Sequence, residues 1–139
     1  MIAVIRISGD VDLPGNIREA LYRLKIRRKY SAVLIHPTQI NMKLLKVLRN
    51  HVAYGTIDNE TLTKLIEKRG KPLEKDKKIN KDEIIEKLDK KTLSDLGLKP
   101  FFRLHPPRGG IDSKKHAGKG KGVLGDNKEK INDLIRRML

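Results

Sequence analysis

The first 57 residues alternate between short apolar runs and amphipathic segments. The runs at residues 2–7, 31–35 and 52–57 are rich in β-branched side chains and bounded by turn-forming residues, which predicts three strands. Each intervening segment repeats apolar residues three or four positions apart, which predicts a helix with one apolar face. These faces comprise Ile17, Leu21 and Leu24 in the first helix and Ile40, Leu44, Leu45 and Leu48 in the second. The order of the segments predicts an α+β core, in which helices cover one face of a small sheet.

Beyond residue 57 the pattern predicts shorter helices and one returning strand. Helical periodicity occupies residues 60–69, 81–88 and 92–96. Residues 101–104 are apolar enough to rejoin the sheet as a strand. A last helix presents an apolar face, and Asp126 or Asn127 is placed to cap it. That face comprises Ile131, Leu134, Ile135 and Met138.

These elements suggest three units along the chain. Residues 1–57 form the core, and residues 58–99 form a helical insertion or extension. Residues 100–139 hold a basic, glycine-rich loop and a C-terminal helix that packs back on the core. The part that follows the core is therefore expected to be mostly helical.

The charge of the chain is strongly positive and is carried by its two ends. Thirty-two Lys and Arg against 17 Asp and Glu give a net charge of +15. Residues 1–57 contribute +7 and residues 100–139 contribute +6, whereas residues 58–99 contribute only +2. A charge of this size predicts a polyanionic partner. Nucleic acid fits better than a membrane surface, since no apolar run approaches the roughly 20 residues of a spanning helix.

Enzymatic chemistry has no support in the residue pattern. The chain has no Cys, and its four His are scattered, so no zinc-binding or nucleophile–base spacing occurs. Asp10 and Asp12 fit a turn before a helix better than a metal site. Glycines near residues 118–122 lack the spacing of a phosphate-binding P-loop. We expect no catalytic residue, no cofactor and no metal, and the absence of a signal-peptide pattern predicts a cytoplasmic protein.

Two segments carry the densest positive charge. Five of the seven residues from Arg23 to Lys29 are basic, at the end of the first helix and in the loop after it. Cations near a helix C-terminus interact favourably with its dipole, which explains part of this cluster, but the run continues past the helix. Residues 103–122 combine cations, glycines and prolines with a single acid, Asp112. A solvated loop remains one interpretation of that segment, and a loop that orders on RNA is the other.

The candidate RNA-binding residues follow from these segments, from the second helix and from the resemblance described below. They are Arg23, Lys25, Arg27, Arg28, Lys29, Lys46, Arg49, Arg103, His105, Arg108, Gly109, Gly110, Lys114, Lys115, His116, Lys119 and Lys121. Their cations would neutralise phosphates, which makes affinity depend on salt concentration. Only five aromatic residues occur, and Tyr54 and Phe102 are expected to pack in the sheet. We therefore expect recognition through backbone charge and RNA shape rather than base stacking.

Several segments resemble the archaeal and eukaryotic form of the ribosomal large-subunit L-thirty family. The resemblance covers essentially the whole chain and rests most specifically on HPPRGG and INDLIRRM. The other matching segments are IAVIRISG, RLKIRRKYSAVLIH, LRNHVAYGTI, LIEKRG and GDNKEK. Because the chain starts at the first strand, without the long basic N-terminal extension of eukaryotic relatives, the resemblance favours an archaeal source.

The resemblance implies a ferredoxin-like fold with a largely antiparallel, three-stranded sheet. It also implies a structural, non-catalytic role in translation, in which the protein binds large-subunit ribosomal RNA and stabilises its fold. The implied partners are this RNA, the small RNA of the central protuberance and neighbouring ribosomal proteins. An RNA-contact role carries over to Arg23, Lys25, Arg27, Arg28, Lys29, Arg108, Gly109 and Gly110.

Two alternative functions stay open from the sequence. A free RNA-binding module, acting in RNA processing or as a chaperone, would carry the same charge but bind many RNAs with similar affinity. A small ferredoxin-like hydrolase of the acylphosphatase type would need Arg18 or Arg23 to hold a phosphoryl group beside a convergent polar partner.

Overall fold

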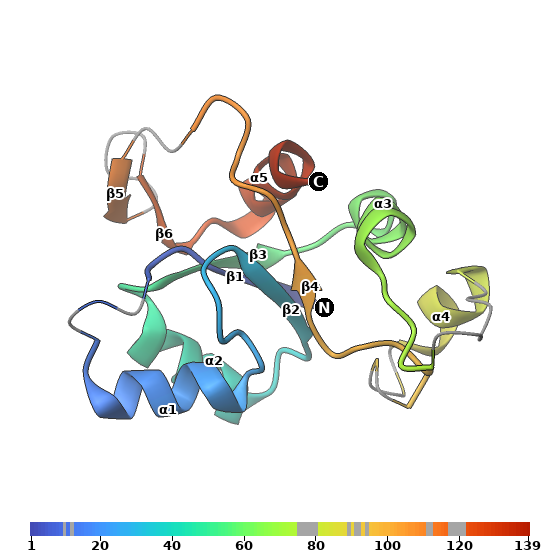
Figure 1. The fold of residues 1–139 in the computed structure, drawn as a ribbon, viewed down its shortest axis with the longest axis horizontal. Helices are drawn as coiled ribbons and strands as arrows, with labels where there is room; N and C mark the ends of the chain where they lie inside the picture. The colour runs from blue at the N-terminus through green and yellow to red at the C-terminus, as the bar shows by residue number, and fades with distance from the viewer. Residues whose placement is uncertain are drawn as a thin grey trace.

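The computed structural model describes residues 1–9, 11, 13–74, 81–88, 90, 93, 95–110, 113–116 and 122–139. In this part of the chain six strands form one sheet in the order β4-β2-β1-β3-β6-β5 (Figure 1). The strands are β1 (Ile2–Arg6), β2 (Ser31–Ile35), β3 (Val52–Thr56), β4 (Phe102–Arg103), β5 (Ser113–His116) and β6 (Gly122–Asp126). The three strands predicted for the core and the strand predicted at residues 101–104 are confirmed.

The centre of the sheet is antiparallel, as the resemblance implies. Strand β1 pairs with β2 on one side and with β3 on the other, so that Ile5 lies opposite both Ala32 and Ala53. Strand β4 extends the sheet beside β2 in antiparallel register. On the other side, β6 pairs in parallel with β3, and β5 pairs in parallel with β6. The segment after the core therefore adds strands as well as helices.

Helices cover both faces of the sheet. Helices α1 (Gly15–Arg23) and α2 (Gln39–Leu48) lie below it in Figure 1, whereas α3 (Asn59–Arg69) and α5 (Ile131–Met138) lie above it. Alternate residues of β1 pack on opposite faces of the sheet. Ile2 and Val4 belong to the hydrophobic cluster under α1 and α2, and Ala3 and Ile5 belong to the cluster under α3 and α5. The α+β core with helices on one face is confirmed, and the C-terminal residues cover its second face.

Local sequence signals account for the ends and the buried faces of several helices. The Thr38 hydroxyl accepts from the Asn41 amide at 3.2 Å and caps α2. Helix α3 ends at Arg69, before Gly70, and α4 (Lys81–Lys87) matches the pattern at residues 81–88. The apolar face of α5 is buried as predicted.

Other local predictions are wrong or only partly tested. Ile40 is 79% exposed, because the buried stripe of α2 is formed by Leu45 and Leu48. The Asp126 carboxylate accepts from the Lys128 amide at the start of the short 3-10 helix η1 (Lys128–Lys130). Neither Asp126 nor Asn127 caps α5, whose N-cap position is Lys130. The helix expected at 92–96 falls partly outside the described residues, and those described there form turns. Asp10, Asp12 and Asp112 also lie outside the described residues.

The C-terminal helix is tied to the core through Gly55 and Asn132. A Cβ atom on Gly55 would lie 2.2 Å from the carbonyl oxygen of Lys128 and 2.9 Å from the Ile131 side chain. The buried Asn132 amide accepts from the Asp58 backbone at 3.0 Å and donates to the Thr56 carbonyl at 3.3 Å. Strand β3 thus needs a glycine where η1 and α5 press against it.

Candidate nucleic-acid interface

One group of exposed cations lies along the edge of the sheet that β4 forms. The loop of residues 24–30 leads from α1 into β2, and the Leu104 amide, just after β4, donates to the Tyr30 carbonyl at 3.1 Å. Ser31 lies opposite Arg103 in the sheet, so the loop and β4 are neighbours. We call the exposed cations of this region the basic surface. It comprises Lys25, Arg27, Arg28, Lys29 and Arg103.

A groove runs between the two segments that carry the basic surface. Lys25, Arg27 and Arg28 line it from the loop, and Pro100, Phe101 and Arg103 line it from β4 and the residues before it. The described residues of its lining include four cations and no carboxylate. A groove of this composition attracts an anion, because the like charges lack a local counter-charge.

The start of the loop is fixed by the way α1 ends. Lys25 adopts a left-handed backbone with φ of 67°, and its amide donates to the Tyr22 carbonyl at 3.0 Å. The next amide, of Ile26, reaches back to the Leu21 carbonyl at 3.1 Å. These two bonds form a Schellman motif, whose left-handed position glycine usually occupies. The backbone that presents the basic surface is therefore strained at Lys25.

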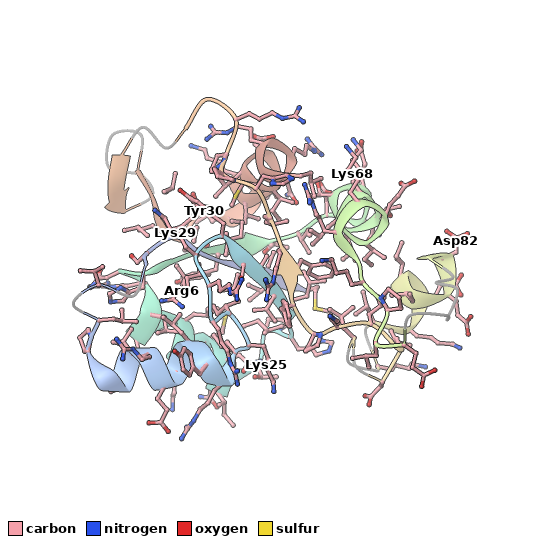
Figure 2. All side chains as sticks on the ribbon, viewed as in Figure 1. Arg6, Lys25, Lys29, Tyr30, Lys68 and Asp82 are labelled. Atoms are coloured by element: carbon pink, nitrogen blue, oxygen red, sulfur yellow. The ribbon has the colours of Figure 1, made fainter. Side chains whose placement is uncertain are left out.

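The middle of the loop is held by a buried arginine. Arg6 is 0% exposed, and its guanidinium donates to the Ser8 carbonyl at 2.9 Å, to the Ile26 carbonyl at 3.2 Å and to the Arg27 carbonyl. The Arg6 carbonyl accepts from the Tyr30 amide at 2.7 Å. Figure 2 shows Arg6, Lys29 and Tyr30 in one part of the molecule, far from Lys68 and Asp82.

The charge of Arg6 also affects the pKa of His51, which lies in the turn before β3. Burial lowers the pKa of His51 from its ordinary value, and the nearby Arg6 lowers this pKa further. The His51 carbonyl accepts from the amides of Ile7 and Ser8, so this residue joins the end of β1 to the start of β3. Its backbone amide donates to the Leu48 carbonyl at 2.8 Å, which closes the turn after α2.

Aromatic rings support several cations of the basic surface. The Arg27 guanidinium lies 5.4 Å from the ring centre of Tyr22, and the Lys29 ammonium lies 5.0 Å from that of Tyr30. Such pairs orient a cation without neutralising it. Arg23 differs, because its guanidinium lies 2.7 Å from the Glu19 carboxylate, which offsets its charge locally.

The predicted Arg-Gly-Gly element forms a turn attached to the end of α5. The Arg108 amide donates to the Arg137 carbonyl at 3.0 Å, and the Arg137 guanidinium donates to the Gly110 carbonyl at 2.6 Å. Gly109 and Gly110 have φ of 81° and 74°, a conformation that glycine adopts at little cost. The exposed His105 lies just before this turn, and its amide also bonds to α5, by donating to the Met138 carbonyl. Arg137 is a contributor that the sequence pattern did not single out.

The remaining candidates do not all join the basic surface. Lys46 and Arg49 are exposed at the end of α2, and Arg49 is close enough to Tyr54 to lower its pKa, which burial and Asp126 raise. Lys114, Lys115 and His116 lie on β5, at the edge of the sheet opposite β4 (Figure 1). Lys119 and Lys121 lie outside the described residues. The second predicted basic segment, residues 103–122, is therefore divided. Arg103 lies in the basic surface on β4, whereas Lys114, Lys115 and His116 lie at the opposite edge, because β1, β2, β3 and β6 separate β4 from β5.

Arg6 is the other residue that the sequence pattern did not single out. A signal for it exists in the sequence, since it is the one charged residue in the apolar run at residues 2–7. A buried charge in a strand requires partners, which points to a structural or functional role.

Two other kinds of feature are absent from the described residues. These residues contain no group of three or more His, Cys, Asp or Glu side chains that could hold a metal ion. Within the same part of the chain, no helix is long and apolar enough to cross a membrane.

The strain at Lys25 gives a first testable prediction. Lys25→Gly is expected to raise the free energy of unfolding by about 1 kcal/mol, because glycine removes the cost of a left-handed side chain. The same change removes a cation and should weaken RNA binding. Lys25→Ala is the matched control, since it loses the same charge and keeps a Cβ. Denaturant unfolding that finds the glycine variant less stable than the alanine variant would contradict this account.

The fold and the basic surface together define a small, strongly basic α+β protein of ferredoxin-like type. No family model matches the sequence. The chain is 39% identical to large ribosomal subunit protein uL30 of Aeropyrum pernix, over all of this chain and 99% of that protein. It is 35% identical to uL30 of Nanoarchaeum equitans and 36% identical to uL30 of Archaeoglobus fulgidus, over at least 99% of each chain. The chain belongs to the uL30 family of large ribosomal subunit proteins, and the resemblance found in the sequence is confirmed.

Proposed function

We propose that this protein is a structural constituent of the large ribosomal subunit that binds large-subunit ribosomal RNA and stabilises its fold in translation. The observation that carries the RNA-binding part is the groove beside β4, whose described lining contains four cations and no carboxylate. Membership in the uL30 family supplies the ribosomal context. The cytoplasmic ribosome is the corresponding location.

The basic surface is built to hold its cations in place before RNA arrives. Hydrogen bonds from the Arg6 guanidinium hold the backbone in the middle of the loop, and the Schellman motif holds the backbone at its start. Cations on a rigid backbone lose less conformational entropy when they bind phosphates than cations on a flexible chain. We therefore assign phosphate contacts to Lys25, Arg27, Arg28, Lys29 and Arg103.

The other candidates form separate contact regions in this proposal. Arg108, Gly109 and Gly110 would present backbone and charge from the turn at the end of α5, together with His105. Arg23 would contribute less than its neighbours, because Glu19 pairs with it. Lys46 and Arg49 at the end of α2, and Lys114, Lys115 and His116 on β5, would bind RNA at other sides of the sheet. Lys119 and Lys121, which lie outside the described residues, remain proposed contacts from the sequence alone.

A protein that binds RNA on several sides can hold separate RNA segments next to one another. The proposed partners are large-subunit RNA, the small RNA of the central protuberance and neighbouring ribosomal proteins. Residues 58–99 carry almost balanced charge, so they are better suited to protein contacts or to solvent than to RNA. No catalytic role is proposed. The acylphosphatase alternative gains nothing from the structure, since Arg18 is exposed on α1 and Arg23 pairs with a carboxylate.

The test compares the wild-type protein with a triple variant, in which Arg27, Arg28 and Lys29 are replaced by alanine. Binding to fragments of large-subunit RNA is measured over a salt series. The slope of log affinity against log salt should fall by about one for each cation that no longer meets a phosphate, so by about three in the triple variant. Affinity at low salt should fall on the order of tenfold or more.

The control for this experiment is a variant that loses three positive charges from another part of the molecule. A variant with Lys64, Lys68 and Lys87 replaced by alanine loses the same charge from α3 and α4 and should keep nearly the wild-type slope. A clear preference of the wild type for one fragment supports the ribosomal role. Equal affinity for every fragment would favour a free RNA-binding module, and an unchanged slope in the first variant would remove the basic surface from the interface.

A further inference from the structure

The groove beside β4 contains an apolar part that phosphate binding does not explain. Pro100 and Phe101 line it together with its four cations. Phe101 is only half-buried, unlike Phe102, which is 1% exposed in the core. The Arg103 guanidinium lies 5.6 Å from the centre of the Phe101 ring. A phosphate needs the cations, but it gains nothing from an aromatic ring and a proline.

We propose that this groove receives a single unpaired nucleobase of the bound RNA, stacked on Phe101 and Arg103, while Arg27 and Arg28 hold its phosphate. The inference rests on the proposed RNA-binding function and adds the chemical form of the ligand. It revises the expectation from sequence that recognition relies on charge and shape without base stacking.

The chemistry of a nucleotide matches the two halves of the groove. Every base has an apolar face that stacks on aromatic side chains and on the planar guanidinium of arginine. Its phosphate carries the negative charge that the cations of the loop attract. A nucleotide therefore satisfies the aromatic part and the charged part at once, which neither a free phosphate nor an apolar ligand does.

The base in this site has to be unpaired. Bases inside an RNA helix are stacked on their neighbours, and the deep, narrow major groove of A-form RNA keeps side chains away from them. A bulged or looped-out base exposes its faces and has already separated from its pairing partner. The groove thus selects irregular RNA over continuous duplex.

Tyr22 also has an arginine guanidinium beside its ring, but its position differs from that of Phe101. Tyr22 is 41% exposed on α1 and supports Arg27 from outside the described lining of the groove. It therefore orients a cation but does not offer a stacking surface inside the groove. This contrast provides a matched control.

The experiment uses RNA hairpins with the same stem, one fully paired and one with a single unpaired 2-aminopurine. Binding of the full-length protein is measured by filter retention and by the fluorescence of the 2-aminopurine. Wild type should bind the bulged hairpin about fivefold or more tightly than the paired one. Phe101→Leu, which keeps an apolar side chain in place, should lose this preference and the fluorescence change, whereas Tyr22→Leu should keep both. Thermal unfolding of each variant verifies that it is folded.

The outcomes separate this inference from the proposed function. If wild type binds both hairpins equally with a steep salt dependence, the nucleobase site is refuted and RNA binding stands. A preference that survives in Phe101→Leu also refutes it, because the selectivity then arises elsewhere. If neither hairpin binds at low salt, the inference fails, and the proposed function is decided by the large-subunit RNA fragments.

Discussion

Gly55→Ala is expected to lower the free energy of unfolding by about 3 kcal/mol, at the upper end of the range for overpacked sites. The added Cβ would lie 2.2 Å from the backbone oxygen of Lys128, and backbone cannot rotate away as the end of a long side chain can. Relief requires η1 and α5 to move off β3. In a chain of this size the melting temperature should fall by roughly 10 °C.

Gly15→Ala is the control for this substitution. A Cβ there would meet nothing within 4 Å, and Gly15 opens α1 with an ordinary helical backbone. Alanine should be neutral or slightly stabilising at that position, because it has the higher helix propensity. Calorimetric melts in which both variants match the wild type would show that α5 does not press on β3 at Gly55.

The expected destabilisation at Gly55 concerns a part of the fold that sequence patterns reveal poorly. Periodicity predicts β1, β2 and β3 and the helices beside them, because each element has its own buried face. It does not predict β5 or β6. Residues 122–126 (GVLGD) contain two glycines and few apolar residues, so their pairing depends on the neighbouring β3 and not on their own propensity.

The same limit applies to the exposed Ile40. Its spacing places it near the apolar stripe of α2, but the buried part of the helix begins only further along, at Leu45. Which part of an amphipathic helix touches a sheet is decided by the length and direction of the loops before and after it. A single sequence carries little information about that.

Some features of the candidate site are also predictable from the sequence, and others are not. Charge density alone predicts that Arg27, Arg28 and Lys29 are exposed, and they are. It does not predict that the basic residues of β5 lie at the other edge of the sheet, because strand order is a property of the whole fold. The roles of Arg6 and Phe101 depend on distances between segments that are far apart in the chain.

Arg6→Met is the second substitution with a large expected effect. Methionine fills much of the same volume but leaves the carbonyls of Ser8, Ile26 and Arg27 without the donors that Arg6 supplies. Buried and half-buried acceptors that lose a charged donor are costly, and we expect the free energy of unfolding to fall by about 3 kcal/mol. Denaturant unfolding measures this decrease directly.

The substitution should also weaken RNA binding under conditions in which the protein remains folded. Arg6 is fully buried, so it does not touch RNA itself, and its effect has to pass through the loop that it holds. Arg28→Met removes the same charge from the exposed part of that loop and should weaken RNA binding with almost no change in stability. Only a positioning role predicts that Arg6→Met lowers both the free energy of unfolding and the affinity for RNA. If Arg6→Met instead leaves the affinity and its salt dependence unchanged, the loop does not need to be held rigidly to bind RNA, and the entropic advantage that we assign to it is absent.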